Sequence, residues 1–342
     1  MVTRVSALRF PNQRASGQWL GPRWLLVLVF FWLAGCSALP LSAPNSPQSP
    51  DQTSAADHWP ESLPSAVSLS QVPFFAQQDH QCGPAALASV LRYSGLKIGP
   101  EALVSQVYTP GLQGSLQLDL VGAARRAGRI PYRIAPNAAA LGQELAAGHP
   151  VLVLQDVGRL TPVWHFAVVV GYDREHQEVW LHSGDQPQLR LSMEQFDRSW
   201  AAGQRWGLVT LSPEQIPASA SATDYLQQVA AMESIRPALA ETAYRSSLKR
   251  WPDALTAWMG LGNLAYGQHH YRTAAGYFEH AVQAHPDAGD AFNNLAQSRL
   301  MLGQMQPARE AIAQALALGG SHLATYRRTQ QAIARQGKAD SM

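Results

Sequence analysis

The C-terminal part of the chain repeats its apolar pattern every 34 residues, so that Ala240 aligns with Ala274 and Ala274 with Ala308. The other aligned pairs are Tyr244 and Phe278, Trp258 and Phe292, Leu261 and Leu295, Tyr271 and Met305, Phe278 and Ile312, Ala281 and Ala315, and Pro252 and Pro286. A period of this length, with small residues where helices cross, indicates helix pairs that stack to bury a continuous core. We therefore expect two good repeats, a degenerate one before them, and a frayed polar capping helix over 321–342.

The repeats over 224–342 resemble tetratricopeptide repeats. The resemblance implies a concave groove that binds a peptide or a protein partner. Two alternatives stay open: the small module simply braces the preceding domain, or it is an unrelated helical hairpin.

The length of 342 residues suggests about two domains. The net charge of +2 is unevenly spread, because residues 1–35 carry four arginines and no acid, which leaves 22 basic against 24 acidic side chains in the rest. A near-neutral chain without a basic, aromatic-rich tract gives no field that would steer nucleic acid, and we expect no nucleic-acid partner.

A ten-residue apolar run over 24–33 follows the arginine-bearing head. It is shorter than the roughly 20 residues of a membrane span and fits a secretory signal peptide. The following Leu33-Ala34-Gly35-Cys36 resembles a bacterial lipoprotein cleavage box. That resemblance implies a signal peptide over 1–35 and lipidation of Cys36; with Ser37 next, it also implies an outer-membrane lipoprotein facing the periplasm. An uncleaved signal anchor is the alternative.

Residues 36–66 are rich in Pro, Ser, Ala, Gln and Asp and predict a flexible tether behind the lipid. We place a first folded domain at 67–212, a linker at 213–223 and the repeat domain at 224–342. Within 67–212, short helices precede a meander of apolar strands, including 151–154 and 166–170. This order predicts an α+β fold.

Cys82 is the only cysteine left if Cys36 is lipidated, so the mature chain cannot form an internal disulfide. It stands just before Gly83, Pro84 and an apolar helical run to Tyr93. A thiol at a helix N-terminus is favoured as the thiolate by the exposed N–H groups and the helix dipole. With a glutamine amide upstream, the pattern suits acyl transfer, although a buried structural cysteine is the alternative.

His165 opens the apolar strand 166–170 and is the candidate base among 11 histidines. His149 and His182 lie beside neighbouring strands and are interpreted as structural. No ligand spacing argues for a metal, and no glycine-rich loop argues for a phosphate cofactor, so we expect neither.

Together, Gln-Cys-Gly-Pro-Ala-Ala-Leu around Cys82 and Trp-His-Phe-Ala-Val-Val-Val-Gly-Tyr-Asp around His165 resemble family thirty-nine of the cysteine peptidases. These are the bacteriocin-leader, or double-glycine, peptidases, which have a papain-like fold. The resemblance covers roughly 70–212. It implies Cys82 as nucleophile, His165 as general base and Gln77 as the oxyanion-hole glutamine, with Gln78 as the fallback.

The chain departs from that family at the third catalytic position. The family has Asp-Pro after the histidine strand, whereas this chain reads His182-Ser183-Gly184-Asp185. Ser183 stands near the expected acid, and Asp185, two residues later, is the carboxylate that could orient the imidazole. The alternative is that Asp185 is an ordinary turn residue.

The sequence therefore predicts a lipid-anchored cysteine peptidase of the cell envelope that acts on a peptide or protein and carries a protein-interaction module. One alternative is an inactive, peptide-binding scaffold, which the missing Asp-Pro favours. Another is amide synthesis or transglutamination by the same two residues.

Overall fold

The computed structural model of the chain describes residues 59–77 and 81–339. The predicted signal peptide, the lipidated Cys36 and the fallback Gln78 lie outside these residues. Within the described part, no helix is long and apolar enough to cross a membrane.

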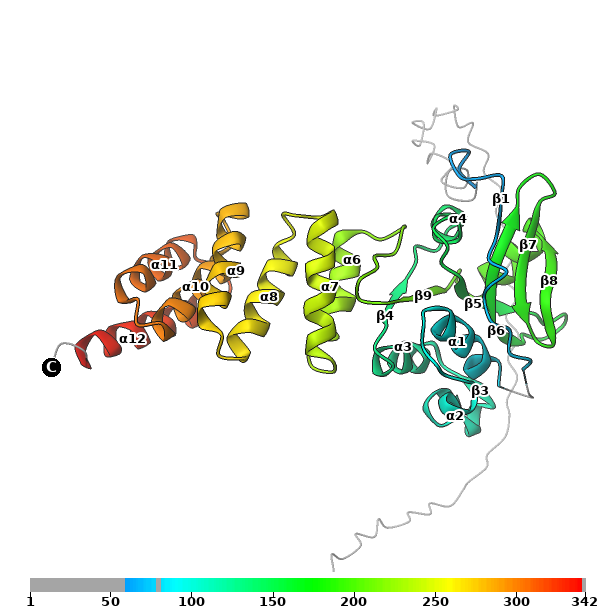
Figure 1. Cartoon of the computed structure of the whole chain (residues 1–342), viewed down its shortest axis with the longest axis horizontal. Coiled ribbons are helices and arrows are strands. Elements are labelled where there is room, and N and C mark those ends of the chain that lie inside the picture. The colour runs from blue at the N-terminus through cyan, green and yellow to red at the C-terminus, as the bar shows by residue number, and fades with distance from the viewer. Residues whose placement is uncertain (1–58, 78–80, 340–342) are drawn as a thin grey trace, which may run out of the picture. The chain divides into compact units, whose positions relative to one another are not determined.

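A seven-stranded antiparallel sheet forms the centre of the first domain in the described chain (Figure 1). Its strand order is β4-β9-β5-β6-β7-β8, and β1 also pairs with β6. The strands are β1 (Ala66–Ser68), β4 (Ile130–Arg133), β5 (Val151–Asp156), β6 (Trp164–Asp173), β7 (Glu178–Ser183), β8 (Gln186–Ser192) and β9 (Gly207–Leu211). Gly171 lets β1 approach β6, because a Cβ there would meet the Val67 carbonyl oxygen and the Trp180 ring.

Both faces of this sheet are buried where its central strands are continuous apolar runs, over 151–154 in β5 and 166–170 in β6. Leu152, Phe166 and Val168 face one core, which is completed by the helices α1 (Cys82–Tyr93), α2 (Glu101–Val107) and α3 (Gln117–Arg126). Val151 and Val169 face the other core, which contains residues of α4 (Ala138–Ala146) and α5 (Met193–Ala202). Side chains that alternate between two helical layers explain the continuous apolar runs in the sequence.

This architecture confirms the predicted α+β class. The predicted strand 166–170 is longer than expected, so His165 is its second residue rather than the residue before it. The glycine-rich stretch 109–115 holds two short strands, β2 (Tyr108–Thr109) and β3 (Gly114–Ser115), around the 3-10 turn η1 (Pro110–Leu112).

The C-terminal helices confirm the tetratricopeptide-like pattern. They are α6 (Ala222–Ala230), α7 (Pro237–Arg250), α8 (Leu255–Gly267), α9 (Tyr271–Ala284), α10 (Gly289–Met301), α11 (Met305–Leu318) and α12 (Leu323–Ala339). The repeated alanines Ala274 and Ala308 are fully buried between the helices, as their spacing predicted. The last helix differs from the expectation of a frayed end, because Tyr326 and Ile333 of α12 are buried in the repeat core.

The connection over 213–223 is held at its middle, over residues 217–219, by hydrogen bonds to α4 and α7. Glu144 of α4 has no exposed surface and accepts hydrogen bonds from the backbone N–H groups of Ala218 (3.2 Å) and Ser219 (2.7 Å) and from the Ser219 hydroxyl (2.6 Å). Arg250 of α7 donates to the carbonyl oxygens of Pro217 and Ala218. The core that contains Val151 of the sheet also contains Tyr244 of α7 and Leu261 of α8.

Candidate active site

Cys82 is the first residue of α1, as the sequence predicted. The helix starts here because Gly83 and Pro84 suit its first turn: Pro84 lacks an N–H that would have no partner, and Gly83 lies against β3. A Cβ on Gly83 would collide with the side chain of Ser115. Residues 83–91 are all buried, so the packing of α1 fixes the position of the thiol.

The protonation state of Cys82 differs from the expectation for a helix N-terminus. Burial of the thiol raises its pKa above the ordinary value. Hydrogen bonding from the backbone N–H groups of Phe166, Gly83 and Cys82 itself acts in the opposite direction but is the smaller effect. Desolvation therefore outweighs the helix terminus, and the resting side chain is a thiol at neutral pH.

His165 lies half-buried near the start of β6, beside the strand residue whose N–H faces the thiol. Its Nε2 is 3.0 Å from the Ser183 Oγ, at the end of β7. Burial lowers the pKa of the imidazole, so the ring is neutral at neutral pH. With Nε2 occupied by the serine, Nδ1 is the ring nitrogen left to exchange a proton.

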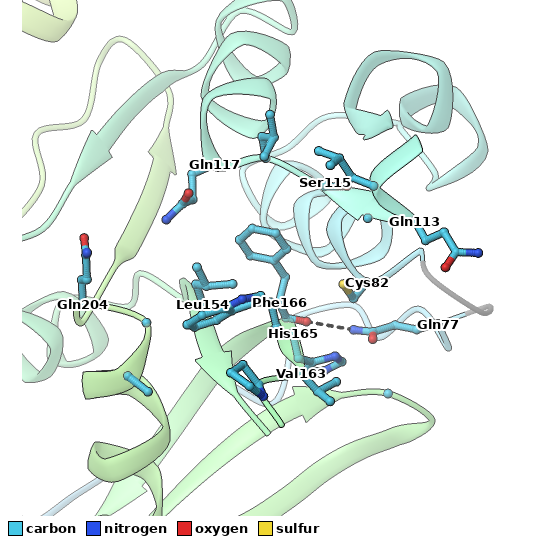
Figure 2. Close-up of a pocket in the computed structure, with 18 residues that line it drawn as sticks. Gln77, Cys82, Gln113, Ser115, Gln117, Leu154, Val163, His165, Phe166 and Gln204 are labelled. Atoms are coloured by element: carbon cyan, nitrogen blue, oxygen red, sulfur yellow. Dashed lines mark hydrogen bonds between the residues drawn. The ribbon is translucent and has the colours of Figure 1, made fainter. Parts of the chain in front are cut away.

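Gln77 is bound at both its main chain and its side chain. Its backbone N–H donates to the Gly184 carbonyl oxygen (3.0 Å), and its Nε2 donates to the Phe166 carbonyl oxygen (3.2 Å). Figure 2 shows Gln77, Cys82 and His165 gathered at one end of the same cleft, with the Gln77–Phe166 bond dashed. The sequence-predicted glutamine, cysteine and histidine are therefore brought together.

Asp185 is placed apart from this group. It lies in the two-residue turn between β7 and β8, after Gly184 with its positive φ of 61°, and its side chain is exposed. No hydrogen bond or ion pair of Asp185 is found within the described residues, whereas Ser183 contacts the imidazole. Ser183, and not Asp185, is therefore the side chain seen in contact with the imidazole, because the tight turn carries the aspartate past the ring.

The cleft around these residues has a volume of about 950 Å³, and the described residues that line it carry no permanent charge. Eighteen described residues line it, and none of them is Asp, Glu, Lys or Arg. Exposed apolar side chains form both rims: Leu112 and Leu116 on the η1–α3 side, and Val163 and Trp164 at the start of β6.

Glutamine amides supply the polar groups along the rest of the cleft (Figure 2). Gln113 (φ 48°) and Gln204 (φ 57°) have left-handed backbones, an uncommon conformation for a glutamine. Gln117, at the start of α3, is a third glutamine that lines the cleft. Sequence reasoning missed these three, because nothing in their local pattern separates them from ordinary surface glutamines.

No cluster of three or more His, Cys, Asp or Glu side chains that could hold a metal is present among the described residues. His182 is buried, and its Nε2 lies 3.0 Å from the Val72 carbonyl oxygen. His149 faces the buried Glu144 at 2.7 Å. Both histidines stabilise the fold, as their sequence positions suggested.

Two parts of the chain match known protein families. Residues 69–206 match the sequence model of the Peptidase_C39 like family, and residues 229–268 and 259–322 match a tetratricopeptide repeat model. The chain therefore carries a C39-like domain followed by tetratricopeptide repeats. No curated protein matches the chain.

Two solved structures resemble the C39-like domain. A Bacillus anthracis protein described as a C39-like peptidase is 16% identical, with 43% of this chain and 98% of that chain covered and a TM-score of 0.35. The peptidase domain of Streptococcus ComA, a bifunctional ABC transporter of a quorum-sensing pathway, is 25% identical, with 41% and 98% covered and a TM-score of 0.33. At these scores the likeness adds nothing to the family match.

The C39-like domain can therefore be described chemically from its own residues. It has a thiol, an imidazole and a glutamine amide beside one cleft, and no bond from a described residue occupies the second imidazole nitrogen or the second amide hydrogen. These groups suit nucleophilic attack on a carbonyl carbon, because each covers a different part of the reaction: attack, proton transfer and stabilisation of the oxyanion.

Proposed function

We propose that this protein is a cysteine peptidase in which Cys82 is the nucleophile and His165 is the general base. The single observation that carries the proposal is that both side chains line one cleft together with Gln77, whose amide is held by the Phe166 carbonyl oxygen. The family match of residues 69–206 supports the same reaction class.

In the proposed reaction, the proton of the Cys82 thiol moves to Nδ1 of His165 as the sulfur attacks the scissile carbonyl carbon. The second Nε2 hydrogen of Gln77 and the Cys82 N–H stabilise the oxyanion. The C–N bond then breaks, and the amine leaves with the proton from His165. Water, deprotonated by His165, attacks the thioester and releases the acid and the thiol.

The substrate of this reaction is proposed to be an extended peptide segment without charged side chains near the scissile bond. Among the described residues, the cleft has apolar rims and amide groups but no Asp, Glu, Lys or Arg side chain that could pair with a buried charge. A charged residue bound there would lose its water without a partner, which is unfavourable.

The anchoring and the partner are parts of the same proposal. The sequence around Cys36 supports a lipoprotein of the cell envelope, on the outer membrane and facing the periplasm. The tetratricopeptide repeats support binding of a protein partner, with a cavity of about 260 Å³ lined by Asn263, Tyr266 and Asn294 as one recognition point.

The test is cleavage of a peptide library, made by digesting total bacterial protein, by the full chain. Mass spectrometry of the new termini should show cleavage by the wild type and none by Cys82→Ala or His165→Ala. Gln186→Ala, an exposed change on β8, is the matched control and should cleave normally. Cleavage that persists in Cys82→Ala would exclude the proposed nucleophile.

An inactive peptide-binding scaffold is the second candidate. The observations that favour it are the neutral Ser183 beside His165 and the raised pKa of Cys82. It predicts that the same library peptides bind the wild type and Cys82→Ala equally and leave uncut. Amide synthesis by the same residues is separated by adding a primary amine and looking for amide products.

A further inference from the structure

The imidazole of His165 has a hydroxyl group as its hydrogen-bond partner, and a hydroxyl affects the protonation of the ring differently from a carboxylate. The Ser183 Oγ lies 3.0 Å from Nε2. A carboxylate can only accept a hydrogen bond, so it fixes the hydrogen on Nε2 and stabilises the protonated ring. A hydroxyl can donate or accept and carries no charge, so it stabilises the protonated ring far less.

The two directions of this bond give different reactivity. If Nε2–H donates to Ser183, Nδ1 has a free electron pair and can take the thiol proton. If the Ser183 hydroxyl donates to Nε2, Nδ1 carries the hydrogen and cannot act as a base. Only the first arrangement is competent, and the serine allows it without forcing it.

We propose that Ser183 is the positioning residue of His165, and that its neutrality leaves the Cys82–His165 pair at rest as a thiol and an imidazole rather than as an ion pair. This inference rests on the proposed roles of Cys82 and His165. In the Asp-Pro pattern a carboxylate would orient the histidine. This chain departs from that pattern near Ser183, the residue that contacts His165.

The charged groups around the pair do not compensate for the missing carboxylate. On β5, Gln155 pairs with His165 in the sheet and is uncharged, and Asp156 is engaged with the backbone N–H groups of Gly158 and Val163. Of the other titratable groups on β7 and α1, His182 is bound to a carbonyl oxygen, Glu178 is paired with Arg190, and Arg92 lies over the Phe75 ring, while Asp185 is in the exposed turn. Asp79 and His80 lie outside the described residues.

Burial acts on both groups in the direction that this arrangement requires. It raises the pKa of the Cys82 thiol and lowers the pKa of the His165 imidazole, and charged neighbours among the described residues contribute to neither shift. At neutral pH the thiol therefore keeps its proton and the ring stays neutral. Thiolate forms only as the pH rises through the raised pKa of Cys82.

The experiment measures alkylation of Cys82 by iodoacetamide between pH 5 and pH 10 in the full chain. A Cys36→Ser background makes Cys82 the sole thiol. The rate should rise with an inflection above the value of about 8.5 for free cysteine, and at pH 7 it should be slower than free cysteine. Ser183→Asp should lower the inflection by about one unit and speed alkylation at pH 7 about tenfold, because the carboxylate stabilises an imidazolium beside the thiolate.

Four further variants test whether the change in alkylation comes from Ser183 acting through His165. Asp185→Asn and Gln186→Asp change charge in the same turn and on β8 and should leave the profile unchanged. Ser183→Thr keeps the hydroxyl and the wild-type profile. Adding His165→Ala to Ser183→Asp should abolish the acceleration, since the carboxylate acts only through the ring.

The inference is overturned if wild-type alkylation already has a plateau below pH 6, which would mean an ion pair, or if Asp185→Asn changes the profile as much as substitution of Ser183. If Ser183→Asp fails to fold by circular dichroism, the imidazole ¹⁵N shifts of the wild type decide, and a protonated His165 at pH 7 refutes the inference. Alkylation requires no substrate. A protein that gives the expected profile but cuts no peptide would thus refute the peptidase and leave the role of Ser183 intact.

Discussion

The side-chain amide of Gln77 donates one hydrogen to the Phe166 carbonyl oxygen, over 3.2 Å, and keeps the other for the cleft. Phe166 also presents its backbone N–H to the Cys82 thiol. Phe166 of β6 therefore lies beside the thiol, whose position is fixed by the packing of α1, and holds the amide donor. This relationship explains how a glutamine from an irregular segment and a cysteine from a helix can share one carbonyl substrate.

Gln77→Ala is expected to lower kcat of the proposed peptidase by about 10²- to 10³-fold, the usual effect of removing one oxyanion donor. KM should change little, because the donated bond strengthens only as charge develops on the oxygen. The measurement is steady-state cleavage of a peptide found in the library experiment. Gln204→Ala, at the far end of the same cleft, is the matched control, and an equal loss of kcat in both variants would contradict the assignment.

The charge-free cleft predicts how substrates are selected. Replacing an uncharged residue next to the scissile bond by aspartate should lower kcat/KM by at least about tenfold, because a carboxylate would be desolvated without a partner. The same replacement at the ends of a long peptide should have little effect. A Gln117→Lys variant, which places a cation in the cleft, should recover part of the loss for the acidic peptide. If Gln117→Lys does not recover activity, the aspartate of the acidic peptide does not lie near α3 in the cleft.

The sequence predicted those features of the fold and site whose signal lies in adjacent residues. Cys82 at a helix start and His165 at a strand follow from adjacent residues: Gly83, Pro84 and the apolar run after position 165. Strand β8 lacked such a signal, since it is an exposed strand containing Pro187. The helix α5 did carry one, because Ser192 and Gln195 form a capping box.

The orienting group and the protonation states required three-dimensional information. Whether Ser183 or Asp185 meets the imidazole depends on a two-residue turn at Gly184, which reverses the chain before Asp185 is reached. Likewise, a helix N-terminus alone predicts a lowered pKa for Cys82, and only the burial of the thiol reverses that direction. Neither burial nor turn geometry can be derived from the residue types near the cysteine.

Removing the carboxylate of Glu144 should cause a large loss of stability. It is fully buried and receives the N–H groups of Ala218 and Ser219, the Ser219 hydroxyl, and a contact from His149. Glu144→Ala leaves these polar groups without a partner, which should lower the free energy of unfolding by about 3–5 kcal/mol. Urea denaturation followed by circular dichroism measures this loss.

The control for Glu144 is Glu241→Ala, which removes a surface ion pair with Arg245 along α7. Such pairs contribute only about 0.3–0.5 kcal/mol. If both alanine variants lost the same stability, the hydrogen bonds to the 213–223 connection would be unimportant. A separate early transition for the repeat helices in Glu144→Ala alone would show that this carboxylate couples them to the C39-like domain.

Two glycines in neighbouring repeat helices predict opposite effects of the same substitution. In α8, a Cβ on Gly262 would collide with the ring of Phe278, so Gly262→Ala should destabilise the chain by about 1–3 kcal/mol through overpacking. In α9, no atom lies within 4 Å of a Cβ on Gly276, so Gly276→Ala should stabilise it by up to about 1 kcal/mol through helix propensity. Urea midpoints of the two variants should therefore move in opposite directions. Two shifts of the same sign would show that the helices do not pack through Gly262 and Phe278 as the repeat pattern requires.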